Sequence, residues 1–249
     1  MGKIVAIGGG ELRNSKTSAI DREVIRLTGK PQPRALFIPT ASSDSVDYWT
    51  AFQSVYGEDL GCETGVVNLL DDHPPLKQIE ESILSSNLIY VGGGNTLKMM
   101  GRWRKLGVDQ ILKAAYARDI VLAGVRARAI CWFKYGHSDS MAFYHPDSWK
   151  YVRVRGMGLI DAFGCPHFDS ETAGKKRNLD LQDMILKHGG TGIGIDNDCA
   201  LEFVGDGFRV IPSKPTAGAY KLHKNRGKVT VEQIQRSQEY LPISSLLRS

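Results

Sequence analysis

The residues of this sequence that could do chemistry follow short apolar runs. Val121–Val125 is a continuous apolar run that leads directly into Arg126 and a helix-like segment. A strand that turns straight into a helix is a position at which a nucleophile can be presented, because the turn exposes its side chain. Here the position carries an arginine, whose guanidinium stays protonated and offers no lone pair for attack. The segment therefore has the form of a nucleophile elbow without a nucleophile.

A second candidate segment is Gly92–Thr96 (GGGNT), which follows the apolar run Asn87–Val91. Glycines that open a helix allow backbone N–H groups to turn toward an oxyanion, and the helix N-terminus favours the negative charge. The same letters also fit a tight turn in which Asn95 or Thr96 caps the helix. These residues alone leave both interpretations open.

Two further side chains are candidates for proton transfer. His167 follows Cys165-Pro166, and Asp139 lies between two serines. A histidine held by a carboxylate can accept and return a proton, because the carboxylate fixes its tautomer and orientation. Taken singly, His167 also fits a hydrogen-bonded structural histidine, and Asp139 a turn or cap residue.

In order and spacing, these segments together resemble the peptidase E and cyanophycinase family of serine peptidases, whose fold is related to the class I glutamine amidotransferase domain. The resemblance covers nearly the whole chain. It implies that Arg126 stands at the nucleophile position, that His167 is the general base, and that Asp139 orients it.

The resemblance also implies positions for oxyanion and substrate binding. The oxyanion donors would be the amides of Gly93 or Gly94 together with that of Ala127. Asn95 and Arg177 would contact the substrate, because a bidentate arginine suits the carboxylate of an acidic peptide. Without the resemblance, Arg177 fits a solvated basic helix turn, and the glycines fit a loop of purely structural role.

The chain departs from the family at the elbow itself. The family's Ser-Ala-Gly is replaced by Arg126-Ala127-Arg128. A long side chain at 128 crowds the packing of helix on strand, and the elbow's strained backbone tolerates a bulky residue poorly. We therefore expect a peptidase E-like exopeptidase or dipeptidase scaffold for small Asp-containing peptides that is catalytically inactive in this chain. The alternatives are a non-catalytic binding protein for an anionic metabolite or acidic peptide, and water activation by the His167–Asp139 pair.

The elements that must position these residues alternate between strand and helix. The pattern predicts a three-layer α/β fold with a mostly parallel, doubly wound sheet and a β-rich part after residue 150. The expected strands are Lys3–Ile7, Arg34–Pro39, Thr64–Leu70, Asn87–Val91, Asp119–Val125, Gly158–Phe163, Gly192–Ile195, Cys199–Val204 and Arg209–Ile211, with a terminal hairpin of Ala219–His223 and Lys228–Thr230. The expected helices are Ser18–Thr28, Val46–Tyr56, Leu97–Leu106, Val108–Arg118, and Glu171–His188, with one opened by Pro74-Pro75 and one beginning near Ala127.

Composition limits the class of protein. The 249 residues are 42% hydrophobic, which excludes disorder as the main state, and the net charge of +5 comes from scattered basic residues. The pattern favours one domain over residues 1–249. A cytoplasmic location is expected because the sequence shows no signal peptide and no long apolar run. No cofactor is expected, and the cysteines form no C-x-x-C pair. We expect no metal, a small acidic peptide or anionic small molecule as partner, no nucleic acid, no membrane, and a monomer or homodimer.

Overall fold

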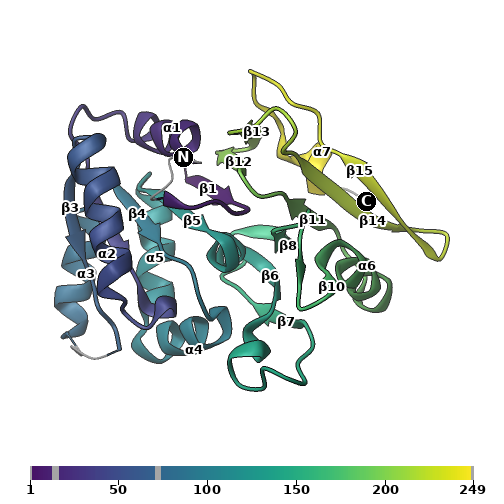
Figure 1. The fold of residues 1–249 in the computed structure, drawn as a ribbon. Helices are drawn as coiled ribbons and strands as arrows, with labels where there is room; N and C mark the ends of the chain where they lie inside the picture. The colour runs from purple at the N-terminus through teal and green to yellow at the C-terminus, as the bar shows by residue number, and fades with distance from the viewer. Residues whose placement is uncertain (1, 13–16, 71–73, 248–249) are drawn as a thin grey trace.

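The computed structural model describes residues 2–12, 17–70 and 74–247, with only the backbone of Ala127 and Arg128. An eight-stranded sheet occupies one side of the molecule (Figure 1). Its strands in spatial order are β16 (Leu241–Pro242), β13 (Gly207–Pro212), β12 (Cys199–Val204), β1 (Lys3–Ile7), β5 (Val121–Val125), β4 (Leu88–Val91), β2 (Arg34–Ile38) and β3 (Glu63–Val66). The five strands from β1 to β3 pair in parallel, whereas β12, β13 and β16 pair antiparallel. The expected mixed α/β architecture is confirmed.

The side chains of β1 show how helices cover both faces of this sheet. Ile4 and Ala6 pack with one set of helices, and Val5 and Ile7 pack with another, as the two-residue period of a strand requires. The first set is α3 (Leu76–Leu84), α4 (Thr96–Leu106) and α5 (Val108–Ala117); the second is α1 (Ser18–Thr28) and α2 (Val46–Phe52), which continues as a π-helix over Gln53–Asp59. All four side chains are fully buried, which explains why the run does not alternate between apolar and polar residues.

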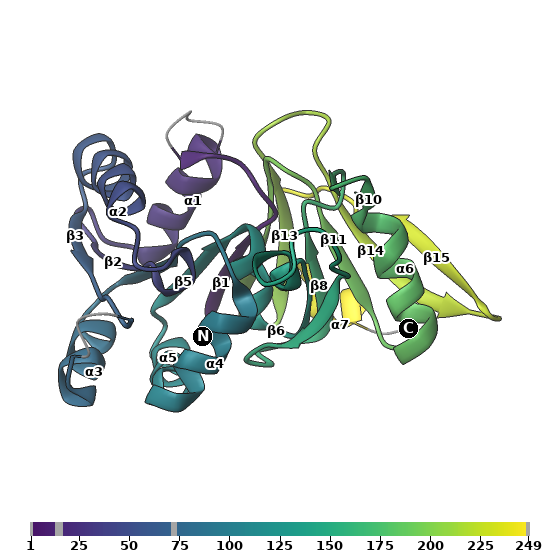
Figure 2. The ribbon, with the colours of Figure 1, turned by 60° about the horizontal axis from the view of Figure 1, so that its bottom comes forward.

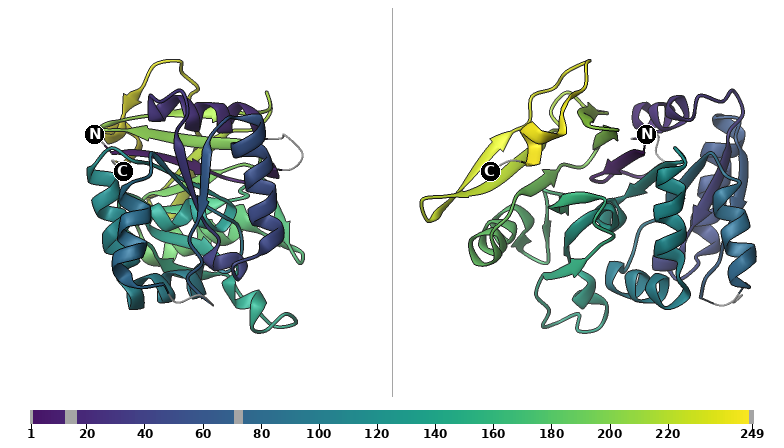
Figure 3. Two further views of the ribbon diagram at one scale, coloured as in Figure 1. Left: turned by 90° about the vertical axis from the view of Figure 1, so that its left-hand side faces the viewer. Right: turned by 180° about the vertical axis from the view of Figure 1, so that it is seen from behind.

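A six-stranded sheet forms the other side of the molecule (Figure 2). Its spatial order is β15 (Lys228–Gln233), β14 (Ala219–Asn225), β11 (Gly192–Ile195), β8 (Ile160–Pro166), β6 (Phe133–Ser138) and β7 (Val152–Arg155). Helix α6 (Arg177–His188) packs against it, and the β14–β15 hairpin extends from the body (Figure 3). The chain closes with α7 (Ile243–Leu247).

Two predicted helices differ from the structure. The helix expected from Glu171 begins only at Arg177, because Glu171–Thr172 (β9) and Lys175–Lys176 (β10) pair as a small hairpin. Ala173 and Gly174 between them adopt φ of 50° and 74°, which closes the turn. The segment after β5 is a 3₁₀ helix, η4 (Arg126–Trp132), rather than an α-helix.

The glycines that follow β1 join the two sheets. His167 donates its backbone N–H to the Gly8 carbonyl (3.0 Å), and Asp198 donates its backbone N–H to that of Gly9 (3.1 Å). A Cβ on Gly9 would lie 2.6 Å from His167 Nδ1, so only glycine allows this approach. Gly8 and Gly9 therefore serve close packing beside His167.

Within the described ranges, no helix combines the length and the apolar character that crossing a bilayer demands.

Candidate active site

The turn after β5 keeps the geometry of an elbow. Arg126 follows the last residue of the strand with φ of 63°, a left-handed conformation uncommon for a residue other than glycine. Val125 pairs with Ile7 of β1, and Gly124 pairs with Val91 of β4. The loops after β1, β4 and β5 therefore meet at one carboxyl edge of the sheet, where ligands bind in open parallel sheets.

The Arg126 side chain lies across the loop after β1. Its Nε and Nη2 each donate to the Gly10 carbonyl at 3.3 Å, and Nη2 lies 3.7 Å from Glu11 Oε1. Two-fifths of the side chain remains exposed. It forms one wall of a cavity of about 270 Å³ between that loop and α2. A cation thus occupies the position from which a nucleophile would act.

The glycine loop after β4 offers backbone donors at the same edge. Gly93 and Gly94 are half-buried, and Gly94 has φ of 139°. In the part of the chain that the structure describes, neither amide has a hydrogen-bond partner. Ala127 is the second residue of η4 and directly follows Arg126. The expected oxyanion donors therefore belong to adjacent loops, and their function stays a prediction.

Asn95 acts as a helix cap. Its Oδ1 accepts the Lys98 backbone N–H at 3.0 Å, its Nδ2 points to the Ser140 carbonyl at 3.5 Å, and its side chain is buried. An amide committed to satisfying the first turn of α4 is not presented to a ligand. Of the two interpretations of this residue, the structure shows the cap. The expected substrate contact stays a prediction.

His167 is held by Asn197. The His167 Nδ1 and Asn197 Oδ1 atoms lie 2.6 Å apart, and Asn197 Nδ2 donates to Asp169 Oδ1 (2.8 Å) and Ser170 Oγ (2.7 Å). Because Nδ2 is engaged by these two acceptors, the oxygen of the amide faces the imidazole, and Nδ1 must carry the proton. The Nε2 atom is left with its lone pair, as a general base requires.

The electrostatic surroundings keep this imidazole neutral. The pKa of His167 is lowered to about 4, mainly by burial and also by the charges of Arg177 and Arg126, whereas the hydrogen bond that His167 donates to Asn197 raises it. The contribution of Arg126 places its charge within electrostatic reach of His167. At neutral pH the site therefore holds an unprotonated base beside a permanent cation.

Asp139 is not the hydrogen-bond partner of His167. Its Oδ2 forms an ion pair with Arg177, whose side chain is 4% exposed and whose guanidinium carbon lies 5.1 Å from the centre of the Tyr151 ring. A buried guanidinium requires an opposite charge, and Asp139 supplies it. The side chain that contacts the imidazole is therefore Asn197 and not the expected Asp139, and Arg177, expected to bind a substrate carboxylate, is paired with Asp139. The roles of both residues stay predictions.

Asn197 is not among the site residues expected from the sequence. It lies in Asp196-Asn197-Asp198, directly after β11, and β11 pairs in parallel with β8, which precedes His167. Ile195 is paired with Pro166, so the two loops leave the sheet side by side. The same rule that pointed to Gly92–Thr96 (polar residues after a buried strand) could have found it.

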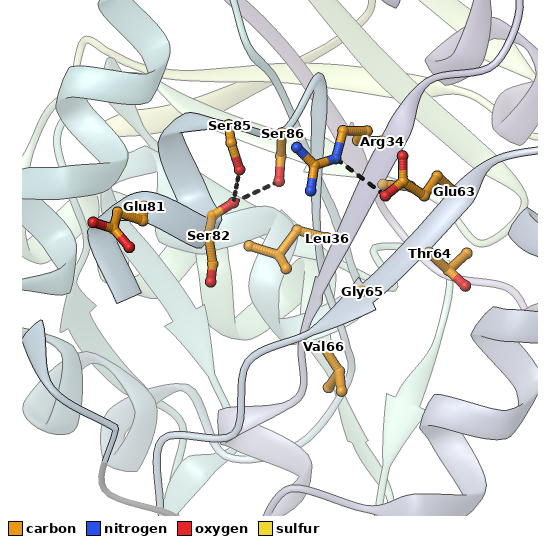
Figure 4. Close-up of a pocket in the computed structure, with 11 residues that line it drawn as sticks. Arg34, Leu36, Glu63, Thr64, Gly65, Val66, Glu81, Ser82, Ser85 and Ser86 are labelled. Atoms are coloured by element: carbon orange, nitrogen blue, oxygen red, sulfur yellow. Dashed lines mark hydrogen bonds and ion pairs between the residues drawn. The ribbon is translucent and has the colours of Figure 1, made fainter. Parts of the chain in front are cut away.

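A larger cavity of about 470 Å³ lies elsewhere (Figure 4). It is lined by the first three residues of β2, by all four residues of β3 and by serines at the end of α3, and Arg34 Nε lies 3.4 Å from Glu63 Oε1. These are the amino ends of parallel strands, opposite the edge that carries Arg126. We therefore place the candidate site at Arg126 and His167. No group of three or more His, Cys, Asp or Glu side chains in residues 2–12, 17–70 and 74–247 is arranged to hold a metal ion.

The sequence and the fold are both similar to those of known proteins. The sequence fits the model of peptidase family S51 over residues 4–211. The chain belongs to peptidase family S51. An uncharacterized peptidase of Bacillus subtilis (strain 168), YgaJ, is 32% identical over 225 residues, which cover 89% of this chain and 92% of that protein.

Solved structures related to this S51 chain share its fold. A peptidase from an acI-B1 actinobacterium superposes with a TM-score of 0.71 at 19% identity, covering 97% of both chains. A putative peptidase E protein from Listeria monocytogenes EGD-e superposes with a TM-score of 0.65 at 16% identity, covering 85% of this chain and 98% of that one. At these identities the likeness establishes the architecture.

Proposed function

We propose that this chain is a member of family S51 that does not hydrolyse peptides by the serine mechanism. The observation that carries the proposal is Arg126 at the elbow, with its left-handed backbone and its guanidinium beside the Gly10 carbonyl. Serine catalysis requires a hydroxyl that attacks the carbonyl carbon and gives its proton to the histidine. A guanidinium can do neither step, so the base at His167 has no proton to take.

Among the residues that the structure describes, three candidates do not replace the missing hydroxyl. Ser138 and Ser140 are buried and hydrogen-bonded to each other at 2.7 Å. Cys131 is fully buried within η4. A nucleophile must reach the substrate carbonyl, so none of these three groups can serve.

Restoring the elbow tests this proposal. We expect the unaltered chain to leave Asp-containing dipeptides intact, and the Arg126→Ser variant combined with Arg128→Gly to cleave them in a His167-dependent manner. Arg126→Ala with Arg128→Gly is the matched control, since it removes the same cations without supplying a hydroxyl. Dipeptide hydrolysis by the unaltered chain that His167→Ala abolishes would overturn the proposal. A folded but inert serine variant would show that Asp-containing dipeptides are the wrong substrate class.

A second candidate function is the binding of an anionic small molecule or acidic peptide. It is favoured by the exposed part of the Arg126 guanidinium, which lines the cavity of about 270 Å³. Calorimetry against succinate and inorganic phosphate, with Arg126→Ala as control, tests this role. We expect weak, salt-sensitive binding that the variant loses, and the absence of binding at millimolar concentrations would contradict the role.

A further inference from the structure

The six-stranded sheet ends in a long edge strand, β15, on the outer side of the hairpin that extends from the body (Figure 3). Its six residues pair with β14, and no other strand of the described residues pairs with them. The opposite edge strand, β7, has four residues, and its exposed Arg153 and Arg155 would oppose each other if two copies paired there. Strand β15 instead carries one exposed charge of each sign, Lys228 and Glu232. It is therefore the edge of this sheet that suits the addition of a further strand.

The turn of the hairpin determines which backbone groups of β15 face outward. Asn225 is paired with Lys228 across a turn of two residues, so these two exchange the first hydrogen bonds of the hairpin. Ile234 donates its backbone N–H to the first residue of β14 at 2.8 Å, which fits the same alternation. Every second residue of β15 from Lys228 onward therefore bonds to β14. The N–H and C=O groups of Val229 and Val231 point away from β14, as a template for another strand.

The side chains of β15 are complementary to those of a second copy. A two-fold axis at Thr230 would pair two β15 strands antiparallel, with Val229 of each copy opposite Val231 of the other. Each such pair exchanges two backbone hydrogen bonds, because both residues have their polar groups facing outward. The same axis places Lys228 opposite Glu232 in a pair of residues whose side chains lie close together. An axis moved by one residue in either direction would separate these two charges.

We propose that β15 pairs with β15 of a second copy of this chain, so that the two six-stranded sheets join into one. A self-complementary patch is what a two-fold dimer requires. The contact would cover Val231, which is 40% exposed, with Val229 of the second copy, and Val229 itself packs against the apolar cluster beneath α6. The hairpin lies outside residues 4–211, which match the family model. The proposal is therefore independent of the chemistry at Arg126.

Sedimentation equilibrium combined with hydrogen exchange tests the dimer and its location. We expect a reversible monomer–dimer equilibrium with a Kd in the micromolar range, since the pairing involves one short strand. On dimerisation, exchange at the Val229 and Val231 amides should slow about 10-fold, and more than at the Thr230 amide, which already bonds to β14. A chain that stays monomeric at millimolar concentration would overturn the proposal, as would a dimer without this protection.

Charge reversal tests the pairing of Lys228 with Glu232. Lys228→Glu alone places two carboxylates opposite each other, and Glu232→Lys alone places two ammonium groups there, so each variant should dimerise about 10-fold more weakly. A mixture of the two variants restores opposite charges at both contacts of the dimer. We expect heterodimers with a Kd within about 3-fold of that of the unaltered chain. Because the heterodimer requires two folded chains, this recovery separates a lost contact from a lost fold.

The matched control is Arg155→Glu, which reverses one exposed charge on the opposite edge strand of the same sheet. It should leave the Kd unchanged. Equal weakening by Arg155→Glu would overturn the proposal, because the effect would then come from net charge. Dimerisation that neither reversal weakens, or a mixture that associates no more tightly than either variant alone, would overturn it too.

Discussion

The two halves of the candidate site differ in how backbone and side chain are arranged. The elbow after β5 keeps its backbone, with φ of 63° at Arg126, but its side chain cannot attack a carbonyl carbon. The base after β8 keeps its chemistry, because His167 is neutral and bound through Nδ1, but its partner is the amide Asn197. The backbone thus has the geometry of an elbow where the side chain is a guanidinium, and the imidazole is neutral where its partner differs from the one expected.

The reason lies in what determines each half. The elbow is positioned by the pairing of β5 with β1 and β4, which does not depend on the side chain at 126. The histidine is positioned by side chains and by backbone contact with the loop after β1. We therefore expect a change of side chain at 126 to leave the fold intact, and a change around His167 to disturb the junction of the two sheets.

The largest effect is expected at that junction. Gly9→Ala places a Cβ 2.6 Å from His167 Nδ1 and against the Asn197 amide, so we expect a loss of about 3 kcal/mol in the free energy of unfolding. Gly101→Ala is the matched control, because Gly101 is exposed on α4 with open space around its Cα, and it should gain about 0.5–1 kcal/mol. Urea denaturation of both variants measures the difference; equal stabilities would contradict the close packing described here.

A smaller effect concerns acid stability. The pKa of His167 is lowered from 6.5 to about 4 in the folded chain, so between these values the unfolded state binds a proton that the native state does not. The stabilisation is complete above pH 6.5 and is lost as pH falls through 4, by at most about 3 kcal/mol. His167→Asn keeps a donor at this position and tolerates the φ of 51°.

Stability curves of the unaltered chain and His167→Asn over pH 4–7 measure this dependence. We expect the variant to show a flatter curve. Curves of the same slope would mean that His167 is not held neutral by its surroundings.

The smallest effect links the two halves. Arg126→Met removes a positive charge that lowers the pKa of His167, so we expect that pKa to rise. The rise should be smaller than the decrease caused by burial, because burial is the larger cause of the shift. The free energy of unfolding should change by less than about 1 kcal/mol, since Arg126 is two-fifths exposed and its pair with Glu11 is weak. Titration of the imidazole by NMR tests the coupling, and an unchanged or lower pKa would show that the guanidinium does not face His167.

Much of the fold could be predicted from the sequence where burial sets a regular pattern. Lys3–Ile7, Ser18–Thr28 and Gly192–Ile195 begin and end as expected, because buried apolar runs end at glycine or polar residues. The strand Phe133–Ser138 was missed, since glycine, histidine and lysine interrupt its apolar residues. The β9–β10 hairpin was missed because its turn contains Ala173 at positive φ. An alanine in the sequence does not indicate such a conformation.

The place of the candidate site in the fold is easier to predict from the sequence than the hydrogen-bond partners of its side chains. The backbone of the chain brings Arg126, Gly93 and Gly94 to one edge, since strand register is encoded by long apolar runs. The partner of His167 depends on which nearby carboxylates already pair with a buried arginine and which carboxylates and amides are left to contact the imidazole. Asp139 pairs with Arg177 because the Arg177 side chain is buried and requires an opposite charge. The spacing of residues along the sequence does not show which side chains are buried.

The measurement that tests the central claim most directly is the intact mass of the protein after treatment with a serine-directed fluorophosphonate. This reagent forms a covalent adduct only with a hydroxyl that is activated by a neighbouring base. The account predicts no adduct on the unaltered chain and one adduct on the Arg126→Ser variant combined with Arg128→Gly. An adduct on the unaltered chain that disappears in His167→Ala would contradict the claim that this S51 scaffold has lost its nucleophile.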